Sequence, residues 1–493
     1  MPVATHHNSG AFAIRKEIIH RVVDCFVNHR ESFAENVSHI SFQMRPVIRN
    51  KESNHNRCCI YKDREIIRYR TMGVLGFLPD EGEDERGLYE YAQNALQRTE
   101  PSHDTIAVID LACDSCIQKS YLVTETCRLC VARNCQNACR KNAISIDRKK
   151  HKAVIDPDSC VNCGKCMDAC PYGAIIHVSI PCEEACPVDA IHKNEFGQRV
   201  INVDKCIDCG KCSAACPFGA VDQISHIVDI MLAVERHKAG EGPPVVAMLA
   251  PSIIGGEQDW IEIVSKLKAF GFADVVTVLD GAGETARREA AEIMERKHEG
   301  KPTTSSCCPA YVNLVDKHIP SLKPYVSTTP SPMVLQHEIM KARDNEKRIY
   351  SFWGPCVAKR REALKVGIDF TATFMELEGL LAVIPDQDVS NMVIPAYPKT
   401  IKFAYATGVT SSVADVLGDD AASLTTTHID GLTRKTVLKL KTFHKKAMKG
   451  DVEDFLEVMS CEGGCIGGPC TNATREKASV RIKKVKVSDD VSL

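Results

Sequence analysis

Short apolar runs alternate with longer amphipathic stretches through the second half of the chain. Such alternation of β-prone runs with helical stretches is typical of α/β domains built on parallel strands. We therefore predict an α/β domain over residues 240–493, with the chain-breaking pair Pro243-Pro244 just before its first strand. The predicted strands are Val245–Leu249, Val275–Leu279 and Arg348–Phe352, and the predicted helices run to about Phe270, start near Glu284 and follow Cys356.

The first half of the chain has a different pattern. Helical stretches at Phe12–Arg30 and Glu85–Arg98 predict a helical N-terminal region over residues 1–105, packed as a cap on the units that follow. Short β-prone stretches such as Ala143–Asp147 predict small α+β units further on. The amphipathic stretch Ile224–Lys238 predicts a helix that links these units to the α/β domain.

The composition is that of a soluble globular protein, with one exception. Of the 493 residues, 44% are hydrophobic and 26% are charged, which excludes a mainly disordered chain. Because 62 Lys and Arg residues nearly balance 64 Asp and Glu residues, neither nucleic acid nor a membrane surface is favoured as a partner. The N-terminus lacks a secretory-signal pattern, so we expect a cytoplasmic protein. The exception is the 25 cysteines, which in a reducing compartment favour metal sites over disulfides.

Sixteen of these cysteines lie between Cys113 and Cys216. The spacing C-x2-C-x2-C-x3-C-P occurs twice in this block, beginning at Cys160 and at Cys206. In bacterial ferredoxins three thiolates of such a run hold one [4Fe–4S] cubane and the fourth holds a second cubane. Zinc is the alternative, but structural zinc sites usually have separated C-x2-C pairs rather than runs of four.

Each run needs a second group of cysteines as its partner, because the fourth cysteine of each group binds the cluster of the other group. This exchange of ligands uses every cysteine of the block. One of the four sets includes the upstream pair Cys113 and Cys116, and it is assigned only because sixteen cysteines make four sets of four. A separate site or a pair of free thiols is the alternative for this pair. The four predicted sets are Cys127, Cys130, Cys135 and Cys170; Cys139, Cys160, Cys163 and Cys166; Cys186, Cys206, Cys209 and Cys212; and Cys113, Cys116, Cys182 and Cys216.

These runs predict two tandem ferredoxin-like units, residues 106–180 and 181–226, each with two [4Fe–4S] clusters. Four similar half-repeats, such as Cys170-Pro-Tyr-Gly-Ala-Ile and Cys186-Pro-Val-Asp-Ala-Ile, support this interpretation. Four accessory clusters in so few residues favour electron conduction, with a purely structural role as the alternative.

The remaining cysteines of the α/β domain lie in three motifs, Ser305–Tyr311, Gly354–Glu362 and Glu457–Cys470. Loops after parallel strands converge on one ligand site, so these motifs are expected to bring thiolates to a common point. The glycines of the third motif allow the backbone to approach a bulky inorganic group. Lys359 can place its ammonium over an anionic ligand.

The three motifs resemble those of the [FeFe]-hydrogenases, T-S-C-C-P-x-W, M-P-C-x-x-K-x-x-E and E-x-M-x-C-x-x-G-C-x-x-G-G-G, over roughly residues 110–470. The resemblance implies a two-lobed catalytic domain with an H-cluster, a [4Fe–4S] cubane joined to a two-iron subsite that carries CO, cyanide and a bridging dithiolate amine. It implies that Cys307 carries protons beside the amine and that Lys359 pairs with a cyanide. The implied cubane ligands are Cys308, Cys356, Cys461 and Cys465, the last bridging to the two-iron subsite. The implied pocket residues are Ala250, Pro251, Ser252, Pro332, Met333, Gly354 and Met459.

The resemblance extends to a proton path. The family has a threonine followed four and seven residues later by two glutamates, then an arginine, and a serine twenty residues after the proton-carrying thiol. On one helix, glutamates three residues apart share a face, as a relay requires. A solvated helix face with ordinary charge pairs is the alternative. The matching residues are Thr285, Glu289, Glu292, Arg296 and Ser327.

Several departures are similar to a divergent branch of the family. Gly354 replaces the common Met, Ala310-Tyr311 replaces Gly-Trp, Met333 replaces Gln, and the third motif ends in Gly-Gly-Pro-Cys470. All four implied ligands, the lysine and the thiol are kept.

The resemblance implies an enzyme that catalyses 2 H+ + 2 e− ⇌ H2 and exchanges electrons with ferredoxin or a similar low-potential carrier. It also implies maturation enzymes of the radical-SAM type and a GTPase. The reduction potential of the proton couple is roughly −410 mV at pH 7, and that of low-potential ferredoxins is roughly −400 mV. Because the two potentials are nearly equal, both H2 production and H2 uptake are feasible. The alternatives are a hydrogen-sensing homologue and a hydrogenase-like iron–sulfur assembly factor.

Two features lie outside these motifs. Cys25, Cys58 and Cys59 are expected to be buried free thiols rather than ligands. The basic stretch Lys477–Lys486 is expected to be a strand-like solvated edge, with docking of an acidic electron carrier as the weaker interpretation.

Overall fold

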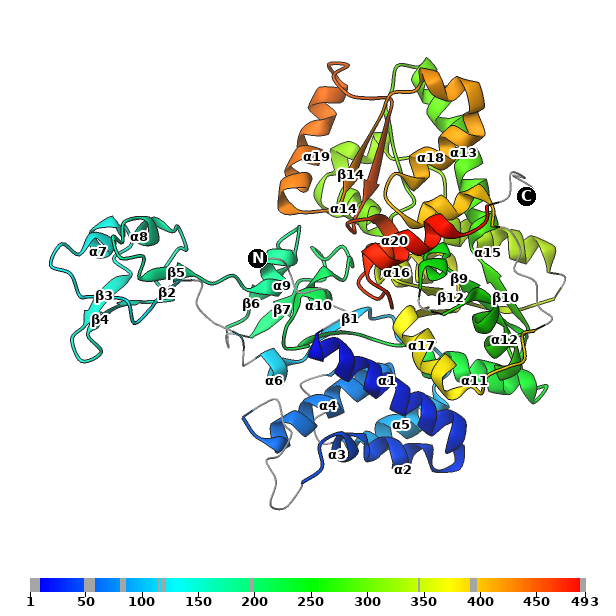
Figure 1. Ribbon diagram of the computed structural model, residues 1–493, viewed down its shortest axis with the longest axis horizontal. Helices are drawn as coiled ribbons and strands as arrows, with labels where there is room; N and C mark the ends of the chain where they lie inside the picture. Colours follow the sequence, from blue (N-terminus) through cyan, green and yellow to red (C-terminus); the bar gives the residue numbers. More distant parts are fainter. Residues whose placement is uncertain are drawn as a thin grey trace.

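The computed structural model describes residues 9–47, 58–79, 86–113, 116, 121–195, 198–256, 258–344, 346–390 and 397–487. Figure 1 shows the N-terminal helices at the bottom, a small lobe projecting to the left, and two sheets with their covering helices on the right and at the top. No helix within the described ranges is long and apolar enough to cross a membrane.

The N-terminal helices pack mainly on the α/β domain. Ile18, Ile19 and neighbouring apolar residues of the first helix are buried in a core that includes α17 (Phe374–Val383). Gly379 allows this contact, since a Cβ there would lie 2.7 Å from Ile19. The region therefore packs on the α/β domain as well as on the second ferredoxin-like unit, whereas the sequence predicted only a cap on the ferredoxin-like units. Its helices are α1 (Gly10–Asn28), α2 (Phe33–Ser38), α3 (Ile40–Met44), α4 (Ile60–Val74) and α5 (Leu88–Gln97).

Contact between the N-terminal region and the second ferredoxin-like unit is both apolar and ionic: Ile66 of α4 packs in one buried cluster with Ile109 and Ala220. Arg15 and Arg70 both pair with the buried carboxylate of Asp222. A buried carboxylate is costly unless it is paired, so this contact holds α1 and α4 to the end of that unit.

Both ferredoxin-like units have the same plan, with a pair of terminal strands, one hairpin and short helices. In the projecting lobe, β2 (Tyr121–Val123) pairs with β5 (Ile175–His177). In the other unit, β1 (Ile106–Val108) pairs with β8 (Val221–Gln223) across the whole length of the first. The hairpins are β3 (Ile144–Asp147) with β4 (Lys152–Ile155), and β6 (Ile191–Lys193) with β7 (Arg199–Ile201); the helices are α7 (Asn134–Ala138), α8 (Lys165–Asp168), α6 (Asp110–Cys113), α9 (Pro181–Ala185) and α10 (Lys211–Ala215).

The units are therefore nested, not tandem as predicted. The lobe over residues 121–177 is inserted between β1 and α9 of the second unit, which explains why Cys113 and Cys116 precede the first unit but belong to the second. Spacing within a run reveals a half-unit, but strand pairing decides which halves lie together.

The α/β domain has two parallel sheets, one in each lobe. The first has the order β10-β9-β12-β13 and the second the order β11-β15-β14. Every residue of β9 is buried, as expected for a central parallel strand. The strands of the first sheet are β9 (Val245–Leu249), β10 (Asp274–Thr277), β12 (Ile349–Gly354) and β13 (Phe370–Thr373), and those of the second are β11 (Thr303–Thr304), β14 (Thr426–Asp430) and β15 (Phe455–Met459).

Helices cover both sheets (Figure 1), and short 3-10 segments lie between helices and strands along the chain. The helices are α11 (Ile227–Lys238), α12 (Trp260–Phe270), α13 (Leu279–His298), α14 (Pro309–His318), α15 (Pro332–Arg343), α16 (Ala358–Val366), α18 (Gly408–Leu417), α19 (Arg434–Ala447) and α20 (Arg475–Lys484). The 3-10 segments are η2 (Arg30–Ser32), η3 (Pro251–Gly255), η4 (Pro320–Tyr325), η5 (Lys399–Ala404), η6 (Gly418–Ser423) and η7 (Gly464–Gly467).

Two expected elements differ. The linking helix α11 is not amphipathic in its setting, because all of Ile227–Val234 is buried between the N-terminal helices and the first sheet. The predicted strand-like tail is mostly helix α20, which is capped by Thr474 and buries Ala478 and Ile482, four residues apart. A helical period of apolar residues within a basic stretch was the signal for this helix.

Candidate active site and thiol sets

The three cysteine motifs meet at one cavity at the carboxyl ends of β9, β12 and β15. This is the position where parallel α/β sheets place ligands. The sequence-predicted residues that line it are Cys307, Cys308, Cys356, Cys461, Cys465, Lys359, Ala250, Pro251, Ser252, Pro332, Met333 and Met459.

Gly354 does not line the cavity, although it was predicted to. It is the last residue of β12 and lies between Phe352 and Pro355, which both line the cavity. A Cβ at this position would lie 2.7 Å from the ring of Phe352, which itself lines the cavity. Phe352 therefore occupies the space that a larger side chain at 354 would need.

The donor set fits an iron–sulfur group with a bulky partner. Burial is the main cause that raises the pKa of Cys356, Cys461 and Cys465, and neighbouring thiols add to the effect. Several thiols placed together in a dry pocket are suited to cationic metal, which favours the thiolate. The buried hydroxyls of Ser252 and Ser460 line the cavity and have no hydrogen-bond partner within the described part of the chain, so the pocket also offers donors to a ligand.

Close packing of backbone around the third motif depends on glycine. Gly464 has φ +80°, and a Cβ there would lie 2.5 Å from the backbone carbon of Tyr405. The glycine therefore lets η7 pack against η5 and places Cys465 at the cavity wall.

Lys359 lines the cavity with its ammonium held by a carboxylate. Its Nζ lies 2.7 Å from Oε2 of Glu362, one helical turn further along α16. Burial alone would lower the pKa of Lys359, but the charge and hydrogen bond of Glu362 and the nearby thiols raise it overall. The lysine is therefore a permanent cation beside the thiols.

Cys307 and Glu289 form a buried pair of proton-holding groups. Burial raises the pKa of Cys307 well above its usual value, and Glu289 and Cys308 raise it further whenever they are ionised. Burial and the charge of Glu457 raise the pKa of Glu289 to about 8. Both Glu289 carboxyl oxygens lack a hydrogen-bond partner within the described part of the chain, although the Ser306 amide and the Ser327 hydroxyl lie close enough to offset part of the shift.

Glu457 is a residue to which sequence reasoning gave no role, although it stands in the third motif. Its carboxylate accepts hydrogen bonds from the backbone N–H of Thr407 and Thr410, both at 2.8 Å, and from the Thr410 hydroxyl at 2.7 Å. These donors lie at the N-terminus of α18, where a carboxylate is stabilised. Burial raises the pKa of Glu457 and these donors offset part of that shift, so Glu457 in its ionised form places a negative charge beside Glu289.

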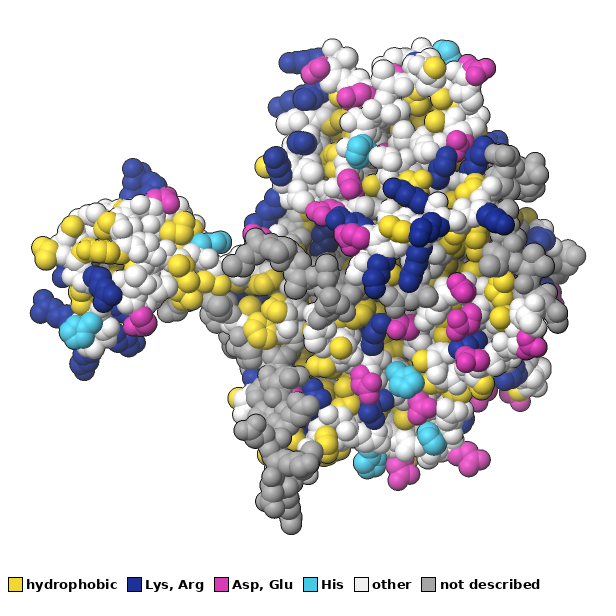
Figure 2. Space-filling view, in the orientation of Figure 1, with side chains coloured by type: hydrophobic (Ala, Val, Ile, Leu, Met, Phe, Trp, Pro, Cys, Tyr) yellow, Lys and Arg dark blue, Asp and Glu magenta, His cyan; other side chains and the backbone are white. Residues whose placement is uncertain are grey.

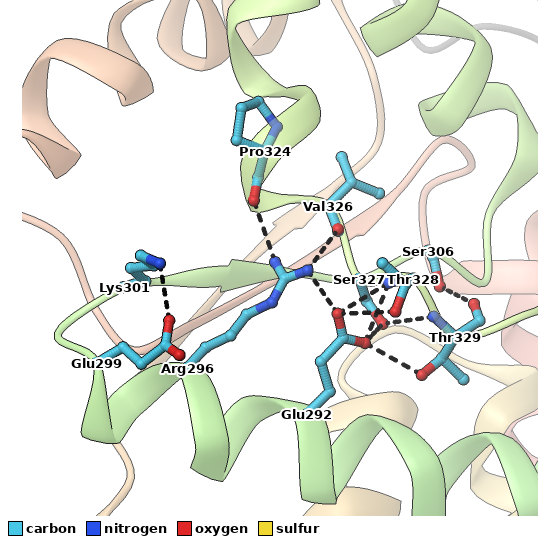
Figure 3. Close-up of polar contacts among 10 residues, drawn as sticks. All are labelled: Glu292, Arg296, Glu299, Lys301, Ser306, Pro324, Val326, Ser327, Thr328 and Thr329. Carbon is cyan, nitrogen blue, oxygen red and sulfur yellow. Dashed lines mark hydrogen bonds and ion pairs between the residues drawn. The ribbon is translucent and has the colours of Figure 1, made fainter.

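Glu292 lies one turn beyond Glu289 in α13 and is bound by many donors (Figure 3). Its carboxylate accepts from the Ser327 hydroxyl at 2.6 Å and from the Thr328 N–H at 2.9 Å, and it pairs with Arg296 at 2.6 Å. Burial would raise the pKa of Glu292, but these donors lower it overall. The structure thus brings Ser327 and Arg296 to Glu292, and Thr285 to the same buried side of α13, where its hydroxyl donates to the Gly281 carbonyl at 2.9 Å.

The other sixteen cysteines group as the crossed assignment expected. Cys139, Cys160, Cys163 and Cys166 line one hollow, Cys186, Cys206, Cys209 and Cys212 a second, and Cys113, Cys116, Cys182 and Cys216 a third. Cys127, Cys130 and Cys170 all lie near enough to Cys135 to raise its pKa, after the larger effect of burial. Within the described ranges no three His, Cys, Asp or Glu side chains converge closely enough for a single metal ion.

Cys209 joins the chain of thiol sets to the active-site cavity. It lines the hollow of its own set and also the cavity that holds Cys308 and Cys461. The neighbouring Gly210 has φ +71°, and a Cβ there would lie 2.8 Å from Pro469 and Val357, so the second ferredoxin-like unit packs directly on the cysteine motifs.

The remaining cysteines do not share one environment. Cys25 is buried, as expected, and burial raises its pKa to about 11. Cys58 is exposed and Cys59 is partly exposed, which corrects the expectation that both are buried; the Cys59 sulfur accepts from the Lys62 N–H at the start of α4. Cys470 is fully buried, away from the cavity wall.

Comparison with known proteins identifies the family of the α/β domain. Residues 243–469 match the family model described as iron only hydrogenase large subunit, C-terminal domain. The chain is a divergent [FeFe]-hydrogenase-like protein. The recognition made from the three cysteine motifs is confirmed by this match, since the matched range contains all three apart from the final Cys470.

The ferredoxin-like units of this hydrogenase-like chain match separate models. Residues 126–174 match a 4Fe-4S dicluster domain, and residues 176–227 match the LdpA Fe-S cluster-binding domain. These matches confirm the iron–sulfur domains that the cysteine spacing predicted.

The relatives that match most of the chain are distant, and a higher identity is found only over a short segment among those compared. The periplasmic [Fe] hydrogenase large subunit of Nitratidesulfovibrio vulgaris is 24% identical over 371 residues, which cover 65% of this chain and 86% of that protein. Ferredoxin 7Fe of Hydrogenibacillus schlegelii is 55% identical over 65 residues, which cover 13% of this chain and 81% of that protein. A solved [FeFe]-hydrogenase structure, HydA(deltaEFG) in stepwise H-cluster assembly, aligns with a TM-score of 0.40 and 19% identity over 52% of this chain and 88% of that one.

Proposed function

We propose that this protein catalyses the reversible reaction 2 H+ + 2 e− ⇌ H2 at an H-cluster and exchanges electrons with ferredoxin through four accessory [4Fe–4S] clusters. The observation that carries the proposal is the active-site cavity, where four thiols of the three motifs share one wall with Cys307 and Lys359. The two-iron subsite of such a cluster, when bound, supplies the hydride chemistry. We further propose a cytoplasmic location and maturation by enzymes of the radical-SAM type and a GTPase.

The residues assigned to hold the cluster are those that the cavity brings together. Cys308, Cys356, Cys461 and Cys465 would hold the cubane, with Cys465 shared with the two-iron subsite. Lys359 would pair with its anionic ligands, because an unpaired anion in a dry pocket is costly. Ser252 and Ser460 would donate their free hydroxyls.

The chain's own residues supply the proton. Cys307 stays a neutral thiol because burial raises its pKa, so it can hold a proton at its sulfur and release it to a stronger base. Glu289, with a pKa of about 8, is protonated near neutral pH and can reload the thiol through the Ser327 hydroxyl. Glu292 is ionised, because Ser327 and Arg296 bind its carboxylate. An ionised carboxylate can accept a proton, so Glu292 would be the outer acceptor of the path. A neutral inner carboxyl and an ionised outer one are suited to directional transfer.

Electrons would reach the cavity from the second ferredoxin-like unit. Cys209 lines both the cavity and the hollow of its own set, so the last accessory cluster would lie against the cubane. The projecting lobe would hold the two outer clusters.

The proposal is tested by assaying anaerobically matured protein for H2 evolution from dithionite-reduced methyl viologen and for H2-driven viologen reduction. We expect turnover in both directions. Matured protein with a full complement of iron that shows neither reaction would refute the enzyme assignment and would favour the assembly-factor alternative; turnover many orders of magnitude below that of hydrogenases would favour the sensor.

A further inference from the structure

The projecting lobe over residues 121–177 differs in charge from the rest of the chain. It contains nine Lys and Arg residues against five Asp and Glu residues, a surplus of four positive charges, in a chain whose net charge is −2. Residues 181–226 of the other unit contain four basic and seven acidic side chains, a surplus of three negative charges. Because each unit carries eight of the cluster-type cysteines, bound clusters would not remove this difference.

One face of the lobe combines this charge with an exposed thiol and exposed apolar area. Cys163 is the exposed member of its set, and Val161 beside it is 59% exposed. Arg140, Lys141 and Lys165 line the same hollow as Cys163 and are all exposed. We call Arg140, Lys141, Val161, Cys163 and Lys165 the rim face. Figure 2 shows the lobe standing away from the body with Lys and Arg side chains among hydrophobic ones.

The rim face has the features of a transient docking surface. An exposed apolar centre with a charged border fits a partner of opposite charge, because complementary charge raises the rate of encounter and fixes the orientation. Electron tunnelling falls steeply with distance, so the cluster whose thiol is exposed is the one that a partner can reduce.

We propose that the rim face is the docking site of a small acidic one-electron carrier protein, with the Cys139, Cys160, Cys163 and Cys166 set as the first electron acceptor. The inference deepens the proposed function, on which it rests, by naming the surface and the charge of the partner. One electron leaves the reduced carrier, which becomes oxidised, and reduces one cubane of the lobe from the 2+ to the 1+ state. No bond or proton changes in this step.

The test compares charge reversals at two places on the same lobe. The rim variant is Arg140→Glu/Lys141→Glu/Lys165→Glu. The matched control is Arg148→Glu/Lys149→Glu/Lys150→Glu in the turn between β3 and β4, which makes the same change in net charge at exposed positions outside the rim hollow. A third variant reverses the exposed Lys477, Lys483 and Lys484 of α20, the weaker docking candidate.

The measured quantity is the second-order rate constant for reduction of the chain's own clusters by a dithionite-reduced acidic ferredoxin, followed in a stopped-flow instrument by the loss of visible cluster absorbance. We expect the rim variant to be at least roughly tenfold slower at low ionic strength, with the loss shrinking as salt rises, and the two other variants to stay within about twofold. Viologen-driven turnover should be unchanged in all three.

Several outcomes would overturn the inference: an unchanged rate in the rim variant, an equal loss in the turn variant, which would show only a general field, or a larger loss in the α20 variant. Self-association that the rim variant abolishes without slowing carrier electron transfer would assign the face to a second copy of the chain. If the rim variant binds less iron, Arg140→Gln/Lys141→Gln/Lys165→Gln replaces it. Because the readout is cluster reduction, a chain that accepts electrons at the rim but evolves no H2 would refute the proposed function alone.

Discussion

Replacing Cys307 by serine isolates the proton-holding role of one sulfur atom. Cys307 is 8% exposed, lies beside the implied ligand Cys308, and is the thiol of the cavity that has no assigned iron. Serine keeps the shape and the hydrogen-bonding capacity but releases its proton far less readily than a thiol, whose unperturbed pKa is about 8.5. Burial raises the pKa of Cys307 further, so the same pocket would make a serine still harder to deprotonate.

The expected loss follows from the size of one proton-transfer step. General acid–base groups contribute about 10²- to 10⁴-fold, so we expect Cys307→Ser to lose at least roughly two orders of magnitude in viologen-driven H2 evolution, or about 2.7 kcal/mol of barrier. The four implied ligands are untouched, so infrared bands of CO and cyanide should be normal. Cys58→Ser makes the same atom change at an exposed cysteine and should keep full activity.

The assay compares turnover per intact cluster in matched samples of the two variants and the wild type. Turnover above about a third of the wild-type value in Cys307→Ser would show that protons reach the cluster by a route that avoids this thiol.

The remaining predictions concern the metal content, the lysine and the inner carboxyl. Anaerobically reconstituted protein without the two-iron subsite should bind about 20 iron atoms from five cubanes, and a reproducible value near 16 would mean that the Cys113, Cys116, Cys182 and Cys216 set holds no cluster. Lys359→Ala should fail to retain the two-iron subsite, because the anion would stay unpaired in a buried pocket; full CO and cyanide bands with full activity would rule out this role. Glu457→Gln removes the charge that, after burial, raises the pKa of Glu289, so that pKa should fall below about 8 and turnover near pH 8 should drop relative to pH 6 by roughly twofold or more. A pH profile identical to that of the wild type would show that the Glu457 charge does not act on the relay.

The cysteine spacing predicted the thiol groups better than the domain arrangement. Ligand spacing is a local property, and the structure brings each predicted set together, including the one that depended on counting. Nesting of the lobe depends on the pairing of β1 with β8, more than a hundred residues apart, and no local pattern encodes it. The N-terminal cap is a similar case, since α1 and α17 meet through the fit of Ile19 against Gly379.

Within the site, the structure brings most residues named from motifs to one cavity. Sequence reasoning missed a residue that acts by its charge on a neighbour distant in the sequence. Glu457 has its effect because β15 and the N-terminus of α18 bring it beside Glu289, a neighbour 168 positions earlier in the sequence. A buried glutamate within a cysteine motif was the available signal. For the basic tail, the apolar pair Ala478 and Ile482 was the signal for a helix, which the charge count concealed.

Infrared spectroscopy of the protein after maturation tests the central claim most directly, because CO and cyanide on iron absorb where no protein group does. We predict both sets of bands in the matured wild-type chain, their disappearance in Lys359→Ala and their retention in Cys307→Ser. Matured protein that holds its cubanes but shows neither CO nor cyanide bands would contradict the assignment of the cavity to an H-cluster.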